Sequence, residues 1–344
     1  MFSWWGRMVV RLSWAVLAAG CCLALVGGLW GAGVFDDLAD DGFTDPGSES
    51  ARAASRIVTE VGRQDVDLLV LYSSTTATVE DSAFREAVAT AVARARHRPE
   101  IATVASHYDT GNPTMVSADR HTTYVAVWLT RAGNTDAFHA VRSDLRAAGL
   151  RTQFAGTTAL TADITDRVSA DIVKAEIVSM PILAVLLLFV FGSAVAAATT
   201  LLIGGLVVLG GFAAVRILTM FTDVSVFGIN IITLLGMGLA IDYALFMVSR
   251  FREELTDGHD SAAAVRRAVS TAGRTITVSA LIVTLALSSL LIFPQMFLRS
   301  MGLGGMIAVL VALVTALTIL PALLAVLGPR VNAGRIRLRR RGPQ

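Results

Sequence analysis

The sequence predicts an α-helical membrane protein with six transmembrane helices and one α+β domain outside the membrane. Hydrophobic residues make up 54% of the chain and charged residues only 16%, whereas soluble proteins carry about a quarter charged residues. The apolar residues gather at the N-terminus and through the C-terminal half, in runs of about 20 residues that match the thickness of a bilayer core. Between these regions, residues 35–175 are rich in charged residues, and their apolar residues recur in short alternating or helical patterns, as in a water-soluble folded domain.

The membrane helices are predicted from the apolar runs. We expect the first, residues 12–34, to stay uncleaved, because the apolar core of a signal peptide is shorter, about 7–15 residues. A cleaved signal peptide and a lipoprotein signal ending at Cys21 are the alternatives. Pro321 is expected to free a backbone carbonyl and kink the sixth span. The other five spans fall within residues 176–328, at about 177–191, 194–218, 224–248, 275–293 and 303–327.

The basic side chains predict the orientation, because arginine and lysine collect on the cytoplasmic side of a membrane. Residues 1–11 and the basic tail at 329–344 fall on one face, and the short loops of the opposite face hold only Arg216 and Arg299. We therefore expect a multi-pass protein of a bacterial plasma (inner) membrane, with both termini cytoplasmic and residues 35–175 extracytoplasmic. The tail either contacts anionic lipid or acts as a plain anchor. Further arginines on the first face are Arg7, Arg11, Arg250, Arg252, Arg266, Arg267 and Arg274.

The extracytoplasmic segment predicts a βαββαβ order, that of the ferredoxin-like or split βαβ unit. Apolar residues recur at helical spacing between residues 80 and 98, at Phe84, Val88, Ala91, Val92 and Ala95. Short runs rich in β-formers and bounded by turn residues predict the strands. The strands are expected at 66–73, 101–107, 122–130 and 151–155, and the helices at 48–62, 80–98, 135–148 and from 158 into the second span.

Composition and motifs exclude several function classes. The only lysine, Lys174, lies in Val-Lys-Ala, so the chain has no P-loop lysine for ATP. Adjacent Cys21 and Cys22 predict neither a disulfide framework nor a zinc site. The acidic stretch from Asp36 to Asp41 does not match a calcium loop, and the five histidines show no metal-ligand spacing. We expect no enzymatic activity, no catalytic residues, no cofactor, no metal and no nucleic-acid partner.

One carboxylate lies inside a predicted membrane helix. Asp242 falls in the fourth span, where a charged side chain costs about 2.5–3.5 kcal/mol on insertion scales. It is therefore expected to find a partner or to bind a proton, and so to act as a proton relay with the Tyr243 hydroxyl beside it. Gly236 and Gly238 precede it on the same helix and permit close helix packing. The alternative is that Asp242 reaches water at the cytoplasmic end of the span.

Other polar residues within the spans suggest a path to this carboxylate. Asn230 and Thr233 lie on the same span, and Thr284 and Ser288 lie on the fifth. The competing explanation is that such hydroxyls bond back to carbonyls of their own helix, which is the commoner arrangement.

The residues around Asp242 resemble a known signature. The segment Gly-Met-Gly-Leu-Ala-Ile-Asp-Tyr-Ala-Leu-Phe-Met-Val-Ser-Arg-Phe-Arg-Glu-Glu-Leu is similar to the fourth span of the MmpL family, within the resistance-nodulation-division (RND) superfamily. The arginine-rich residues 264–276 and the Leu-Pro-Ala-Leu-Leu end of the sixth span fit as well. The resemblance implies proton-driven export of lipids or other hydrophobic small molecules, with residues 35–175 as a porter domain. It places Asp242 and Tyr243 at the family's proton-relay positions, with membrane lipids and protons as partners.

The chain departs from that family in length. Family members usually carry two such halves, and this chain resembles the N-terminal half only, so Asp242 lacks its expected partner. A homo-oligomer, a separately encoded second half and a truncated inactive remnant all fit, and we favour the need for another chain. The alternatives to transport are a non-transporting membrane scaffold or remnant and a translocation accessory like the SecD/SecF pair.

Overall fold

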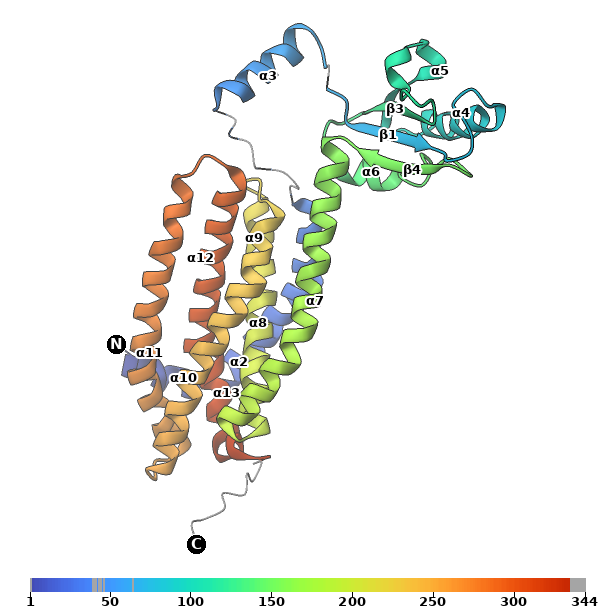
Figure 1. Cartoon of the computed structure of the whole chain (residues 1–344). Coiled ribbons are helices and arrows are strands. Elements are labelled where there is room, and N and C mark those ends of the chain that lie inside the picture. The colour runs from blue at the N-terminus through green and yellow to red at the C-terminus, as the bar shows by residue number, and fades with distance from the viewer. Residues whose placement is uncertain (1, 39–41, 43–44, 46, 64, 335–344) are drawn as a thin grey trace. The chain divides into compact units, whose positions relative to one another are not determined.

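The computed structural model describes residues 2–38, 42, 45, 47–63 and 65–334. The basic tail predicted at 329–344 lies outside the described residues from residue 335 onward. The chain divides into two compact units. The helix unit combines the N-terminal segment to Ser48 with the chain from Val173 onward, and the sheet unit comprises Glu49–Ile172. Figure 1 shows a bundle of long helices in the first and a sheet with covering helices in the second.

The described residues contain six helices long and apolar enough to cross a membrane, so the predicted number of spans is confirmed. The second helix, α7 (Thr157–Phe191), begins within one residue of the expected position, 158, and runs without a break for 35 residues. One difference concerns the extent of the helices. The fifth, α11, already begins at Ser261, because the arginine-rich residues before the apolar run continue the same helix. The remaining helices of the unit are α1 (Phe2–Arg11), α2 (Ser13–Leu29), α8 (Ala194–Thr219), α9 (Val226–Ile231), α10 (Met237–Thr256), α11 (Ser261–Ser288), α12 (Met296–Leu317) and α13 (Ile319–Leu327).

Glycines set the spacing between these helices. Gly27 of α2 lies against the backbone of Leu209, and Gly304 of α12 lies against the backbone of Gly228, so that a Cβ at either position would collide with main-chain atoms. Small residues allow this close approach, from which helices in lipid gain their van der Waals contact. The glycine-rich composition of the C-terminal half therefore reflects helix packing.

The sixth span is broken where proline predicts it. Pro321 has no N–H to donate to the carbonyl four residues earlier, that of Leu317. Accordingly α12 ends at Leu317, Thr318 leaves the helical conformation with φ −121°, and α13 begins at Ile319. The predicted kink is confirmed. The indole Nε1–H of Trp5 on α1 donates to the freed Leu317 carbonyl at 2.9 Å, so a side chain from the first helix completes the hydrogen bonding of the last.

The sheet unit contains a four-stranded antiparallel sheet in the order β2-β3-β1-β4. The predicted β-α-β-β-α-β order is present along the chain, with two differences: the short helix α5 (His107–Thr110) follows β2 and was not predicted, and the helix expected at 135–148 ends at Val141. The strands are β1 (Leu68–Ser73), β2 (Ile101–Ser106), β3 (Thr122–Leu129) and β4 (Arg151–Ala155), and the helices are α3 (Glu49–Glu60), α4 (Ser82–Arg96), α5 (His107–Thr110) and α6 (Thr135–Val141).

The core of the sheet unit lies between one face of the sheet and its helices. Alternate residues of β1, Leu68, Val70 and Tyr72, are fully buried, as the period of two in a strand requires. The predicted apolar face of α4 packs with them: Phe84, Val88, Ala91, Val92 and Ala95 are all buried in this cluster.

Tyr72 also explains why α6 is short. Its hydroxyl donates to the Leu145 carbonyl at 2.6 Å, and burial raises the pKa of Tyr72, so that the hydroxyl stays protonated and keeps donating. The chain after Val141 turns to present that carbonyl while the Leu145 side chain stays in the core.

A buried carboxylate just before β1 forms hydrogen bonds with the end of β3 and the turn after it. Asp67 is 4% exposed and accepts the backbone N–H groups of Leu129 at 2.7 Å and Gly133 at 3.1 Å. Arg63 pairs with the same carboxylate and donates to the Leu129 carbonyl at 2.7 Å. Both carboxylate oxygens are therefore satisfied, which makes the loss of this charge costly.

We expect Asp67→Asn to destabilise the sheet unit by about 2–3 kcal/mol, because hydrogen bonds to a charged group are the strong ones and the new amide N–H₂ would face donors. Pulse proteolysis of the full chain at rising temperature measures the loss. The matched control is Asp65→Asn, two residues away and exposed, which should leave the midpoint unchanged. Equal midpoints for the two variants would contradict the fastening role.

The Trp5–Leu317 bond predicts a coupling between α1 and α13. Trp5→Phe should lower stability by about 1 kcal/mol, the net worth of one hydrogen bond. In a Pro321→Ala background the restored N–H serves the Leu317 carbonyl, and Trp5→Phe should then cost measurably less. Thermal unfolding of the four proteins in detergent completes this double-mutant cycle, and purely additive effects would refute the coupling.

Candidate functional site

The site is built on α10, directly after an irregular turn. Residues Ile232–Gly236 form a π-helical turn between α9 and α10. Such turns insert an extra residue into a helix and recur at functional sites. Because the turn precedes Asp242 by about two helical turns, it sets which side of α10 carries the carboxylate.

Asp242 lies on the outward side of the helix unit. Its side chain is exposed, whereas its neighbours Ile241 and Tyr243 are 7% and 4% exposed. The residues one turn before and after it, Gly238 and Phe246, are also exposed. The carboxylate therefore lies on an apolar face in the middle of a helix long enough to cross the membrane.

A cavity of about 500 Å³ opens beside this carboxylate, between α10 and α11. Three hydroxyl side chains line it together with Asp242: Tyr243 of α10, and Thr275 and Ser279 of α11. Its other lining residues are apolar, and no described basic side chain contributes to it. The arrangement can pass a proton between hydroxyl oxygens and a carboxylate, since each hydroxyl both donates and accepts.

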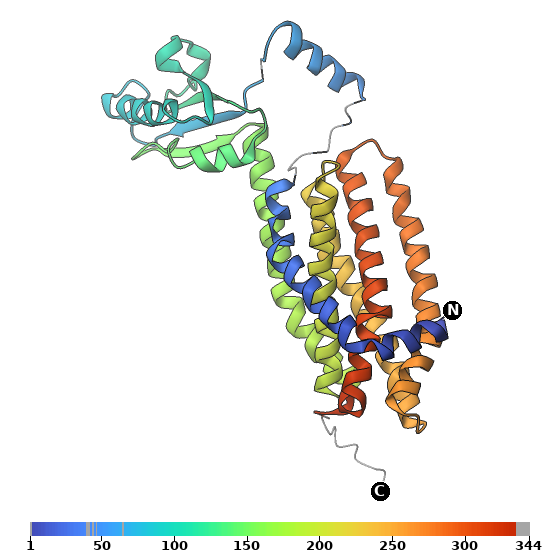
Figure 2. The ribbon, with the colours of Figure 1, turned by 180° about the vertical axis from the view of Figure 1, so that it is seen from behind.

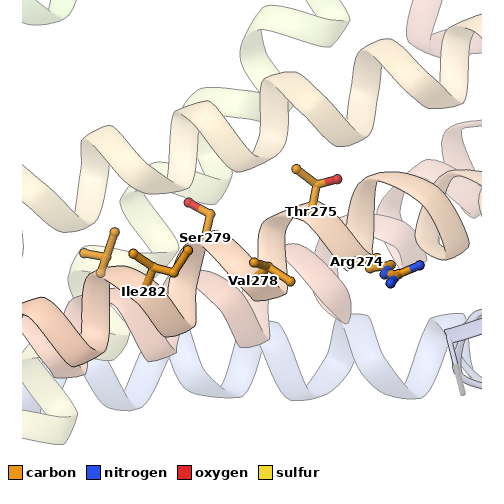
Figure 3. Close-up of a pocket in the computed structure, with 6 residues that line it drawn as sticks. Arg274, Thr275, Val278, Ser279 and Ile282 are labelled. Atoms are coloured by element: carbon orange, nitrogen blue, oxygen red, sulfur yellow. The ribbon is translucent and has the colours of Figure 1, made fainter.

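A second cavity of about 440 Å³ adjoins the first along α11. It shares Thr275 and Ser279, and adds Arg274 at the end of the arginine-rich segment. Figure 3 shows the Thr275 and Ser279 hydroxyls on one side of α11 and the Arg274 side chain directed away from them. The two hydroxyls, one helical turn apart, therefore line both cavities.

Of the neighbouring residues Asp242 and Tyr243, Tyr243 is the buried one. Its phenol oxygen has no hydrogen-bond partner among the described residues. Ser279 is the hydroxyl that approaches it, but the geometry between the two falls short of a hydrogen bond. Buried hydroxyls almost always have a partner, so this oxygen is ready to bond a group that enters the cavity.

The structure separates the other predicted polar residues from this cavity. Thr233 donates to the Asn230 carbonyl at 3.1 Å, and Ser288 donates to the Leu285 carbonyl at 2.7 Å. Both hydroxyls thus bond back to their own helix. Thr284 has a buried hydroxyl without a partner among the described residues. None of these four residues, Asn230 included, lines the cavity that contains Asp242.

The two glycines differ in their surroundings. A Cβ at Gly236 would lie 3.2 Å from the Ala308 Cβ of α12, so this residue lies where two helices pack closely. Gly238 has open space at the same position, on the exposed face with Asp242.

Sequence reasoning missed Thr275 and Ser279. Their spacing of four residues places them on one face of a helix, which was the signal available. Which face of α11 meets α10 depends on the packing, however, and the sequence alone does not define it.

A second carboxylate on α10 differs from Asp242 in its charged partners. Glu254 is 2% exposed and pairs with Arg250 at 2.6 Å, His259 at 3.3 Å and Arg267 at 3.8 Å. Burial is offset there by surrounding cations, as buried charges require. Asp242, three turns earlier, has no such cations in its cavity.

The described residues contain no group of three or more histidine, cysteine, aspartate or glutamate side chains able to hold a metal ion. The two cysteines, Cys21 and Cys22, are free and exposed.

Comparison with known proteins identifies the family. A model of the MMPL family matches residues 42–342. The chain belongs to the MMPL family. The resemblance drawn from the Asp242–Tyr243 segment is therefore confirmed, and the six apolar helices make this MMPL chain a multi-pass inner-membrane protein.

Three relatives show how the chain relates to longer family members. The trehalose monomycolate exporter MmpL3 of Mycolicibacterium smegmatis is 36% identical over 97% of this chain. A membrane protein of Streptomyces coelicolor is 37% identical over 98%, and the mycolic acid-containing lipids exporter MmpL11 of Mycolicibacterium smegmatis is 40% identical over 50%. The chain spans 34% of the length of MmpL3 and 48% of the Streptomyces protein.

The exposure of Asp242 predicts its reactivity. We expect a lipid-soluble carbodiimide, which reacts with protonated carboxyl groups in apolar surroundings, to label Asp242 in the purified full chain. Glu254 on the same helix, buried and paired, should stay unlabelled. Peptide mass mapping identifies the adduct, and Asp242→Asn must remove it. Labelling of Glu254 with Asp242 unmodified would contradict the geometry described.

Proposed function

We propose that this chain forms part of an RND-type, proton-coupled exporter of lipids or other hydrophobic compounds, with Asp242 as the group that takes up and releases the proton. One observation carries the proposal: Asp242 lies on an apolar membrane face without a compensating cation, beside three hydroxyl groups. A charged aspartate at the centre of a membrane helix costs about 2.5–3.5 kcal/mol. Protonation removes that charge, and exposure of the site to water restores it.

The same chemistry supplies a coupling step. When the cavity opens to the side rich in protons, Asp242 binds one and becomes neutral, and the apolar face can then close around it. When the cavity opens to the other side, the proton leaves and the charge again demands water or a partner. Each charge that crosses the membrane potential yields about 2.3 kcal/mol per 100 mV. Tyr243, Thr275 and Ser279 carry the proton between Asp242 and water.

The orientation in this proposal follows from charge. Arginines lie at the end of the helix unit where α10 ends and α11 begins, including Arg250, Arg252, Arg266 and Arg267. By the positive-inside rule that end and both termini are cytoplasmic, and the sheet unit is extracytoplasmic.

We propose that the sheet unit is a ferredoxin-like porter domain. The order β2-β3-β1-β4 in an all-antiparallel sheet supports that assignment, as does the position of α4 between β1 and β2 and of α6 between β3 and β4 along the chain. Substrate passage through it, without chemical change, is the role that the family assigns to such domains.

A second half completes the site in this proposal. The exposed face around Asp242 and the Tyr243 hydroxyl, which has no partner among the described residues, could both be completed by groups from another surface. This chain spans about a third of the length of MmpL3. Either a homo-oligomer or a separate RND half would supply that surface. The names of MmpL3 and MmpL11 support a lipid as the transported compound.

The decisive experiment uses Asp242→Asn, which keeps the shape of the side chain and removes its titration. Proteoliposomes that hold the chain and its partner half, loaded with a pH-sensitive dye, report proton flux. We expect the flux to fall at least about 100-fold, as when other positioned proton-transfer groups are removed. Asp223→Asn, an exposed aspartate in the α8–α9 connection, is the control and should retain the flux. Undiminished proton-dependent transport by Asp242→Asn would overturn the proposal.

A further inference from the structure

The N-terminal helix α1 is a separate element with its own orientation. It ends at Arg11, and Leu12, with φ −106° and ψ 21°, breaks the helix before α2 begins. Figure 2 shows α1 lying across the bundle, at a slant to the long helices. Residues 1–11 were predicted only as a cytoplasmic segment, and the helix that they form has no role in proton coupling as proposed above.

The two sides of α1 differ in what they contact. Its inner side packs on α11: Gly6 lies against the backbone of Arg266, and Phe2 reaches Gly273. Val9 on this side is 3% exposed. Its outer side carries Trp4, Arg7, Met8 and Arg11, all exposed, at the i, i+3, i+4, i+7 spacing of one helix face.

The outer side combines large apolar groups with positive charge. Trp4 is 57% and Met8 is 43% exposed, which is unfavourable for a surface in contact with water alone. The Trp4 and Trp5 rings lie 6.4 Å apart. Neither α1 nor α11 contains an acidic residue. Arg266 and Arg274 of α11 add to the charge of Arg7 and Arg11.

The position of α1 along the bundle corresponds to a membrane boundary. It packs beside residues 266–273 of α11, directly before the stretch from Thr275 to Ser288, which contains no charged residue. On its other flank, Trp5 bonds to Leu317, the last residue of α12. Tryptophan and arginine are the residues that favour this boundary between lipid chains and headgroups.

We propose that α1 is an interfacial helix whose outer side binds anionic phospholipid, with Trp4 and Met8 at the level of the acyl chains and Arg7 and Arg11 on the phosphate groups. Amphipathic helices of this composition lie in the plane of the interface and respond to lipid charge. Through Trp5, a lipid bound to α1 also holds the junction between α12 and α13. The inference requires a membrane around the helix unit but does not rest on the proton-coupled function.

Native mass spectrometry of the detergent-solubilised full chain tests lipid binding, with phosphatidylglycerol as the probe and phosphatidylcholine as the uncharged comparator. We expect preferential retention of phosphatidylglycerol. The double variant Arg7→Gln/Arg11→Gln should weaken it about 25-fold, since each basic side chain near an anionic surface contributes about fivefold. The matched control is Arg52→Gln/Arg56→Gln, two exposed arginines at the same spacing on α3 of the sheet unit, which should change nothing.

Two further measurements keep the test decisive. Arg7→Lys/Arg11→Lys retains the charge and should retain binding even if the glutamine variant folds poorly. The fluorescence of Trp4 is the difference between the unsubstituted chain and Trp4→Phe. In nanodiscs, lipids brominated in the upper acyl chain should quench this difference. Equal affinity for the two lipids, unchanged binding by the glutamine variant, or no quenching of Trp4 because another protein surface covers it would each overturn the proposal.

Discussion

The bilayer core contains no water, so every polar group that enters it must find its partner within the protein. This constraint accounts for most features of the helix unit. Hydroxyls such as Thr233 and Ser288 bond to carbonyls of their own helices, and Glu254 is surrounded by cations. Even the carbonyl freed by Pro321 is taken up by Trp5. Against that background, Asp242 is exposed on an apolar face and the buried Tyr243 hydroxyl beside it has no partner among the described residues.

Glu254 and Asp242 show that burial and charge are balanced differently on a single helix. Glu254 contributes to stability because its charge is permanently compensated. Among the described residues, those that line the cavity with Asp242 are apolar or carry hydroxyls, so its charge depends on what lies beside it at a given moment. That dependence is what a proton carrier needs, since a carboxylate with a fixed cation has little reason to change protonation state.

Much of this architecture was predictable because its signals are local. Apolar runs define the membrane helices, a short run of β-formers before turn residues defines β1, and the period of Phe84, Val88 and Ala91 defines the buried face of α4. Asp242 was identifiable because a charge inside an apolar run is costly wherever the helix faces. The lining hydroxyls depend instead on helix rotation. Thr275 and Ser279 are a threonine and a serine four residues apart on α11, as are Thr284 and Ser288. Only the packing of α10 on α11 shows which pair lines the cavity. The helix α1 was missed because ten residues of mixed character give too short a periodic signal.

The π-helical turn at Ile232–Gly236 has a consequence for how this gene can change over generations. Each residue of an α-helix advances the chain by about 100°, so loss of one residue from that turn would swing every later side chain of α10 around the axis. Asp242 would leave its face, and Glu254 would move away from Arg267 of α11, in the same event. Insertions and deletions in this segment should therefore be strongly selected against, because a change in its length would redirect an oriented acid several residues away.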